Sequence, residues 1–179
     1  MTSRVSGRLI SENARILRQL HEALHQAFRD DSHGAAHHAA CSEFRERYDG
    51  LVFPGGLARF LERLERFETS EVEGAVCFLE AQPCFFRSGY IEQRLLQRLK
   101  HYALTGRQEK RLRRLVLRSL DGGGRRAFRG YSRLAGRLKT DGLHAEVEKR
   151  ARYTDAEVAR RAEAVLHVWR SQLAAVRRG

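Results

Sequence analysis

Apolar residues recur at the three-to-four-residue spacing of an α-helix through almost the whole chain, and no segment shows the alternation of a strand. Only two prolines, Pro54 and Pro83, occur among the 179 residues, so long helices are permitted nearly everywhere else. Hydrophobic residues make up 42% of the chain, which is enough to build a core and argues against wholesale disorder. The sequence therefore predicts an all-α fold, either one compact domain or a short repeat array.

Start and stop signals divide the chain into about nine helices. The stretches "SEVE" at 70–73 and "TGRQ" at 105–108 have the pattern of capping boxes, and "TDAE" at 154–157 is a further start signal. We expect Pro54 to open one helix and Asp141 to cap another. The predicted helices cover about 8–29, 33–49, 54–67, 70–82, 90–101, 105–120, the segment from the glycines at 122–124 to 139, the segment after 141, and 154–176.

From residue 70 onward, helix pairs begin near 70, 105 and 142, a spacing typical of helical-hairpin repeats. In the last pair, "DAEVARRAEAVL" at 155–166 resembles the second helix of a HEAT repeat, where an acid precedes a valine, an arginine–alanine pair and a leucine. The resemblance lies mainly in 141–176 and implies a curved stack of antiparallel helix pairs. An irregular helical bundle is the alternative architecture.

The predicted organisation has two parts. Residues 1–68 contain an N-terminal helical hairpin and a third helix, and residues 69–179 form a basic, HEAT-like helical region. We expect the hairpin to pack on the stack of helix pairs, so that both parts form one compact unit.

Cysteine usage and hydropathy indicate a cytoplasmic protein. Cys41, Cys77 and Cys84 are odd in number and lack the spacing of a disulfide framework, which favours a reducing compartment. The N-terminal segment has no uninterrupted apolar stretch of the kind found in signal peptides. No segment approaches the roughly 20 apolar residues of a membrane span, so no membrane partner is expected.

Positive charge is concentrated in the second half of the chain. The net charge is +12, yet residues 1–86 contain 10 Lys/Arg and 13 Asp/Glu, whereas residues 87–179 contain 24 and 9. Within residues 87–139, 16 basic residues face 3 acidic ones. A coding bias toward arginine, which supplies 30 of the 34 basic residues, does not explain why the first half is spared. The asymmetry suggests an acidic polymer as partner.

The basic residues of this region form rows along predicted helices. On the helix at 105–120 the arginines recur at i, i+4, i+7 and i+11, beside an apolar face, and the next helix repeats the design. Arginine forks suit phosphate oxygens, so two such rows can follow a nucleic-acid backbone without reading its sequence. The candidate phosphate-binding residues are Arg94, Arg98, Arg107, Arg111, Arg114, Arg118, Arg125, Arg126, Arg129, Arg133 and Arg137.

The stretch "GGGRR" at 122–126 lies between the two rows. Its glycines suit a turn, whereas Arg125 and Arg126 stand at a helix N-terminus, where cations oppose the helix dipole. A bound anion would reverse that sign, since backbone N–H groups and two guanidinium groups would converge on it. We therefore expect a phosphate contact here in addition to the turn.

Residues 21–25 read "HEALH" and resemble the HExxH motif of zinc peptidases in those five residues. The resemblance implies metal binding by His21 and His25, with Glu22 as the general base. Only twenty residues precede the motif, the extended histidine continuation is absent, and Met1 is the only methionine, so no Met-turn is present. A peptidase is therefore disfavoured, and a metal-dependent hydrolase is kept only as an alternative.

A second metal hypothesis uses the first two helices together. If they form an antiparallel hairpin about residue 31, His25 falls opposite His37 and His21 opposite Cys41. These four side chains would then complete a tetrahedral, structural zinc site. The alternative is that the histidines belong to the core and that Cys41 acts as a small packing residue.

Taken together, the rows of arginine favour a nucleic-acid-binding helical protein that contacts DNA or RNA phosphates through helices at about 90–139. We expect it to act as a subunit of a larger complex and to catalyse no reaction. The first alternative is a HEAT-like adaptor that docks an acidic protein, and the second is the hydrolase that uses "HEALH". No cofactor is expected apart from the zinc of the second metal hypothesis.

Overall fold

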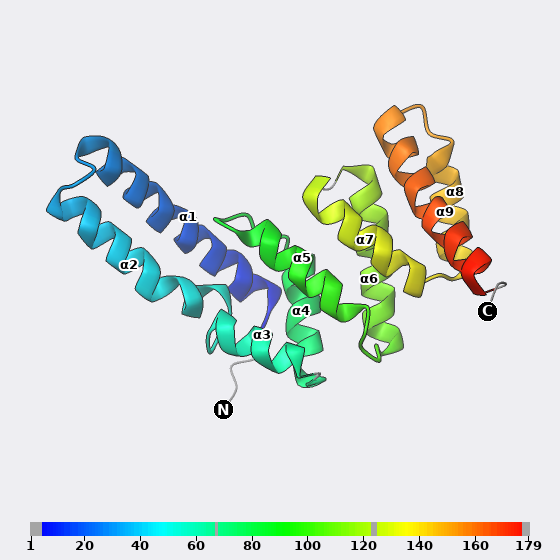
Figure 1. Cartoon of the computed structure of the whole chain (residues 1–179), viewed down its shortest axis with the longest axis horizontal. Coiled ribbons are helices and arrows are strands. Elements are labelled where there is room, and N and C mark those ends of the chain that lie inside the picture. The colour runs from blue at the N-terminus through cyan, green and yellow to red at the C-terminus, as the bar shows by residue number, and fades with distance from the viewer. Residues whose placement is uncertain (1–4, 67, 123–124, 177–179) are drawn as a thin grey trace. The chain divides into compact units, whose positions relative to one another are not determined.

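A computed structural model describes residues 5–66, 68–122 and 125–176 of the chain. Within these ranges the protein is all-α, with nine helices and no strand, which confirms the predicted fold class (Figure 1). No helix among the described residues is both long enough and apolar enough to cross a membrane. The helices are α1 (Gly7–Asp30), α2 (Ala35–Val52), α3 (Leu57–Glu65), α4 (Ser70–Ala81), α5 (Ser88–Leu99), α6 (Gly106–Asp121), α7 (Arg125–Arg137), α8 (Asp141–Ala151) and α9 (Ala156–Val176).

One predicted capping box forms and another does not. At the start of α6, the Thr105 hydroxyl accepts from the Gln108 backbone N–H, and the Gln108 side chain accepts from the Thr105 N–H. At the start of α4 the predicted box at Ser70 is wrong. Thr69 already has helical dihedrals (φ −64°, ψ −22°), whereas a capping residue needs an extended backbone. Ser70 is therefore a residue of the helix itself.

Two other start signals shift by one residue. The cap of α8 is Thr140, whose hydroxyl accepts from the Leu143 N–H, so Asp141 is the first helical residue rather than the cap. Before α9 the Asp155 carboxylate accepts from the N–H groups of Glu157 and Val158. Both positions leave an acidic residue at or before the first turn, where the helix dipole favours negative charge.

The chain divides into two compact units, Met1–Ile91 and Glu92–Gly179. In unit 1, α1 and α2 form the predicted hairpin, and α4 packs on both α1 and α3. Its core includes three stacked rings, since Phe53 lies 3.8 Å from Phe60 and 5.2 Å from Phe78 between ring centroids. The sequence-based boundary at 68/69 lies within unit 1 because α4 shares this core.

Unit 2 contains two successive helix hairpins, α6–α7 and α8–α9, and α7 also packs on α9 (Figure 1). The Trp169 indole N–H of α9 is buried and donates to the Ala135 carbonyl of α7 at 2.9 Å. Leu112, Leu115 and Val116 of α6 lie in the core, on the apolar face that the helical spacing indicates. Paired hairpins suit both a HEAT-like stack and an irregular bundle, so the HEAT resemblance stays a prediction.

Candidate nucleic-acid interface

Helix α7 is enclosed on most of its circumference, and its exposed side consists of arginine. Among its described side chains, from Phe128 to Arg137, only Arg129, Arg133 and Arg137 are exposed. The spacing of four residues places these three side chains on one face, and we call them the arginine ridge. The neighbouring face of α7 is buried and consists of Tyr131, Ser132, Leu134 and Ala135.

Contacts on the other faces of α7 determine which way the ridge points. A Cβ atom on Gly130 would lie 2.7 Å from Leu96 Cδ1 and 3.1 Å from Leu96 Cβ, so a larger residue at this position would require Leu96 to shift. The Tyr131 hydroxyl donates to the Glu92 carboxylate of α5 at 2.8 Å. Together with the Trp169–Ala135 hydrogen bond, these contacts orient α7 on two sides. The ridge is therefore presented by a well-packed helix rather than by a loop.

Helix α6 carries a second exposed basic row, with one change from the prediction. Arg107, Arg114 and Arg118 are exposed, but Arg111 is half-buried, and the exposed Lys110 takes its place in the row. Arg113, which the sequence pattern did not single out, forms an ion pair with Glu109 at 3.2 Å. Four exposed cations on one helix still supply the electrostatic footprint expected of a phosphate-binding surface.

Each of the three acidic residues of segment 87–139 already has a partner in the protein. Glu109 pairs with Arg113, Asp121 pairs with Arg150 of α8 at 2.7 Å, and Glu92 accepts from Tyr131. Burial raises the pKa of the Glu92 carboxyl above its usual value, while the hydrogen bond from Tyr131 opposes that shift. In the part of the chain that the structure describes, Arg129 and Arg133 have no ion-pair or hydrogen-bond partner.

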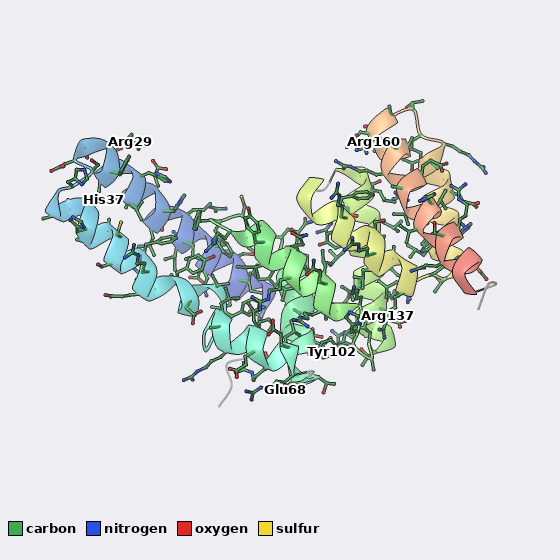
Figure 2. All side chains as sticks on the ribbon, viewed as in Figure 1. Arg29, His37, Glu68, Tyr102, Arg137 and Arg160 are labelled. Carbon is green, nitrogen blue, oxygen red and sulfur yellow. The ribbon has the colours of Figure 1, made fainter. Side chains whose placement is uncertain are left out.

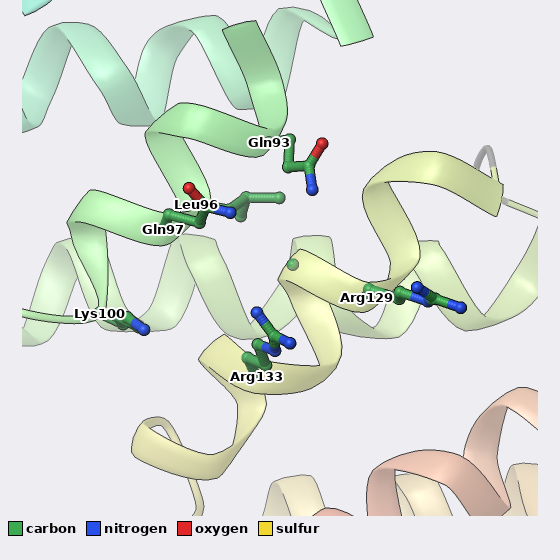
Figure 3. A pocket seen from close by; sticks show the side chains of 7 residues that line it. Gln93, Leu96, Gln97, Lys100, Arg129 and Arg133 are labelled. Carbon is green, nitrogen blue, oxygen red and sulfur yellow. The ribbon is translucent and has the colours of Figure 1, made fainter. Parts of the chain in front are cut away.

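A polar pocket lies between α5 and α7, beside the ridge. It has about 450 Å³ of empty space including its open mouth, and Arg133 projects toward the space between the two helices (Figure 3). None of the seven lining residues is acidic. Gln93, Leu96 and Gln97 of α5 line the pocket, together with Lys100 directly after that helix. The other lining residues are Arg129, Gly130 and Arg133 of α7.

Several of the predicted arginines also have contacts within the protein. Arg94, Arg98, Arg111 and Arg118 each interact with another group of the protein, and the Arg137 guanidinium donates to the Lys100 carbonyl. Arg125 and Arg126 begin α7, but their side chains and residues 123–124 lie outside the described residues. The phosphate contact expected at "GGGRR" therefore stays a prediction.

Sequence reasoning missed the contribution of Gln93, Gln97 and Lys100. These residues follow one another at i, i+4 and i+7, with Lys100 directly after the end of α5, so the spacing indicates that they share one face. Nothing in the spacing shows that this face lies beside α7, because the contact joins Leu96 to Gly130, more than thirty residues further along the chain.

The predicted register of the α1–α2 hairpin is wrong by three residues. His37 contacts Phe28 rather than His25 (ring centroids 5.4 Å apart), and His21 contacts Phe44 rather than Cys41 (5.7 Å). The turn occupies residues 31–34, so the hairpin is centred on the middle of that turn instead of on residue 31. Figure 2 shows Arg29 and His37 near the tip of this hairpin.

The shifted register separates the four proposed zinc ligands into two pairs. On α1, the rings of His21 and His25 lie 4.4 Å apart, and on α2, Cys41 Sγ lies 3.5 Å from His37 Nε2. Within the described residues, no group of three or more His, Cys, Asp or Glu side chains is placed to hold a metal ion. The zinc site stays a prediction that this geometry does not favour.

The "HEALH" residues take part in ordinary helix-surface and ring contacts. Glu22 forms an ion pair with Arg29 at 3.1 Å, and His21 stacks on Phe86 with ring centroids 5.0 Å apart. Burial, followed by the neighbouring His25, lowers the pKa of His21. The sheet of a zinc peptidase has no counterpart among the described residues, which contain no strand.

Comparison with protein-family models, with curated proteins and with solved structures finds no match for this chain. The arrangement of α5, α6 and α7 is therefore interpreted from its own chemistry. That chemistry is a surface rich in guanidinium groups, next to a pocket that combines carboxamides with cations.

Proposed function

We propose that the protein binds nucleic acid, DNA or RNA, by contacting phosphates through the arginine ridge of α7 and the exposed basic row of α6. These contacts are not sequence-specific, and the protein acts as a subunit of a larger complex. One observation carries the proposal: every exposed side chain in the described part of α7 is an arginine.

Phosphate binding offsets the repulsion between the arginines of α7, which nothing on that helix relieves. Like charges at i, i+4 on a helix repel by a few tenths of a kcal/mol per pair, and α7 contains no acidic residue to relieve that repulsion. A polyanion relieves it at several positions at once. Arginine is also the side chain best suited to the task, since its planar fork matches the oxygens of a phosphate.

The test is the salt dependence of binding, measured by fluorescence anisotropy with a labelled oligonucleotide of about 20 residues. Phosphate contacts predict that the logarithm of affinity falls linearly with the logarithm of salt concentration. The double variant Arg129→Glu/Arg133→Glu should bind at least tenfold more weakly, with a salt slope reduced by about two.

The matched control is Arg45→Glu/Arg59→Glu in unit 1. Both arginines are exposed, and in the described residues neither has an ion-pair partner, so the control changes the net charge equally and breaks no pair. The control should keep affinity within about twofold of the wild-type value. Equal losses in both variants would mean that net charge, not the ridge, governs binding. A wild-type protein that ignores oligonucleotides but retains an acidic protein would support the adaptor instead.

A further inference from the structure

The pocket between α5 and α7 contains more hydrogen-bonding capacity than the protein itself uses. Among the residues that the structure describes, no internal partner is found for the side chains of Gln93, Gln97, Lys100, Arg129 and Arg133. Polar side chains that line one pocket and have no partners of their own are available to a ligand. Leu96 and Gly130, which are both buried, complete the lining.

The mixture of groups points to more than a phosphate. Three cations would suffice for an anion, but the two glutamines on successive turns of α5 add neutral carboxamides. A carboxamide presents a donor and an acceptor side by side, the pattern that matches the edge of a nucleobase. The pocket thus has groups for both parts of a nucleotide.

We infer that this pocket receives an unpaired base and the adjoining phosphate of single-stranded nucleic acid. The inference rests on the proposed function and makes its substrate class specific. In a duplex the bases are stacked and paired, whereas in a single strand a base can turn outward into a concave site. The edge of the base lies toward Gln93 and Gln97, and the phosphate lies between Lys100 and Arg133.

The pocket is partly open to solvent rather than enclosed. Its open mouth allows the strand to continue in both directions, along the arginine ridge on one side. A single strand bound this way makes phosphate contacts at the ridge and one base contact in the pocket.

The experiment compares a fluorescent single strand of about 20 nucleotides, as DNA and as RNA, with the corresponding duplexes. For at least one of the two nucleic acids, the wild-type protein should bind the single strand about tenfold more tightly than the duplex at equal salt. The variant Gln93→Ala/Gln97→Ala should lose about tenfold in affinity for that single strand, the effect of one bidentate base contact. Its salt slope should not change, because no charge is removed.

Two controls keep the result interpretable. Alanine is the best helix former, so the variant should keep the wild-type thermal midpoint, which circular dichroism checks. Gln19→Ala/Gln26→Ala places the same substitutions on the exposed face of α1, and it should keep wild-type affinity for every oligonucleotide.

The possible failures are distinguishable. A duplex bound as tightly as the single strand, or an unchanged affinity in Gln93→Ala/Gln97→Ala, overturns this inference and leaves phosphate binding by the ridge in place. A wild-type protein that binds neither oligonucleotide overturns the proposed function, and this inference falls with it.

Discussion

The arginines of unit 1 and those of the arginine ridge occupy similar positions on helices but have different surroundings. In unit 1 several exposed arginines have an acidic residue within one or two turns of the same helix. The ridge residues lie on a helix without any acidic residue. The unit 1 pairs are Arg29–Glu22, Arg47–Glu43 and Arg66–Glu62, with N···O distances of 3.1, 2.6 and 2.6 Å.

The contrast also holds inside unit 2. Arg150, Arg160, Arg161 and Arg170 of the α8–α9 hairpin all have acidic partners, two of them through Glu157. The difference teaches that net charge is a poor guide to a binding surface. Helix α7 differs because its exposed arginines have no acidic residue on the same helix. The three acidic residues of segment 87–139 already have other partners.

The largest expected effect concerns one of those committed acids. Tyr131→Phe leaves the half-buried Glu92 carboxyl without its hydroxyl donor, which should lower the free energy of unfolding by about 1–3 kcal/mol. Chemical denaturation monitored by circular dichroism measures it. Tyr153→Phe, at an exposed tyrosine, should stay within about 0.5 kcal/mol. Equal effects would show that Glu92 is not held by Tyr131.

A paired arginine should matter for stability. The Arg150 side chain is 13% exposed and bonds both Asp121 and Glu146, so Arg150→Ala should cost about 1–2 kcal/mol. The cost is limited because both acids are themselves close to half exposed and regain water. A loss below about 0.5 kcal/mol in the same denaturation experiment would show that the paired Arg150 contributes no more to stability than an arginine of the ridge.

Unit 1 offers a matching test at a polar group that lacks a partner. His37 Nδ1 is buried without a hydrogen-bond partner among the described residues, so His37→Leu should leave stability unchanged or raise it by up to about 1 kcal/mol. Thermal melting with and without EDTA checks this. If the wild-type midpoint falls with EDTA and the variant loses that response, the zinc prediction is supported instead.

Removing a ridge arginine should have the opposite sign to removing Arg150. Arg133→Ala relieves repulsion from Arg129 and places a better helix former on an exposed position, so stability should rise by a few tenths of a kcal/mol at low salt. The gain should shrink as salt is added. A loss of more than about 0.5 kcal/mol would mean that the ridge supports the fold.

The smallest expected effect is a pH dependence in unit 1. Burial and the neighbouring His25 hold the pKa of His21 below its usual 6.5, so the unfolded chain binds this proton more readily than the folded protein. The corresponding stability is full above pH 6.5 and is lost as the pH falls through the folded pKa. His21→Gln should flatten the decline of the melting temperature between about pH 7.5 and 5. An identical decline in both proteins would contradict this assignment.

Much of the fold was predictable because its signals are local. Helix α6 begins at the capping box that "TGRQ" indicates, and its buried face is the one that helical spacing selects. Predictions were wrong where the backbone conformation of an adjacent residue or turn determines the structure. Ser70 does not cap α4 because Thr69 is already helical, and the register of the α1–α2 hairpin differs from the predicted one because the turn occupies residues 31–34.

The sequence by itself determined the all-α fold, the approximate helix limits and the concentration of arginine in 87–139, since each depends on residues within a few turns of one another. Only the tertiary structure decided which cations remain available. Asp121 is engaged by Arg150 from another helix, and the α5–α7 pocket lies where Gly130 packs closely on Leu96. Contacts between residues this far apart in the chain depend on how whole helices pack, and spacing along one helix carries no information about them.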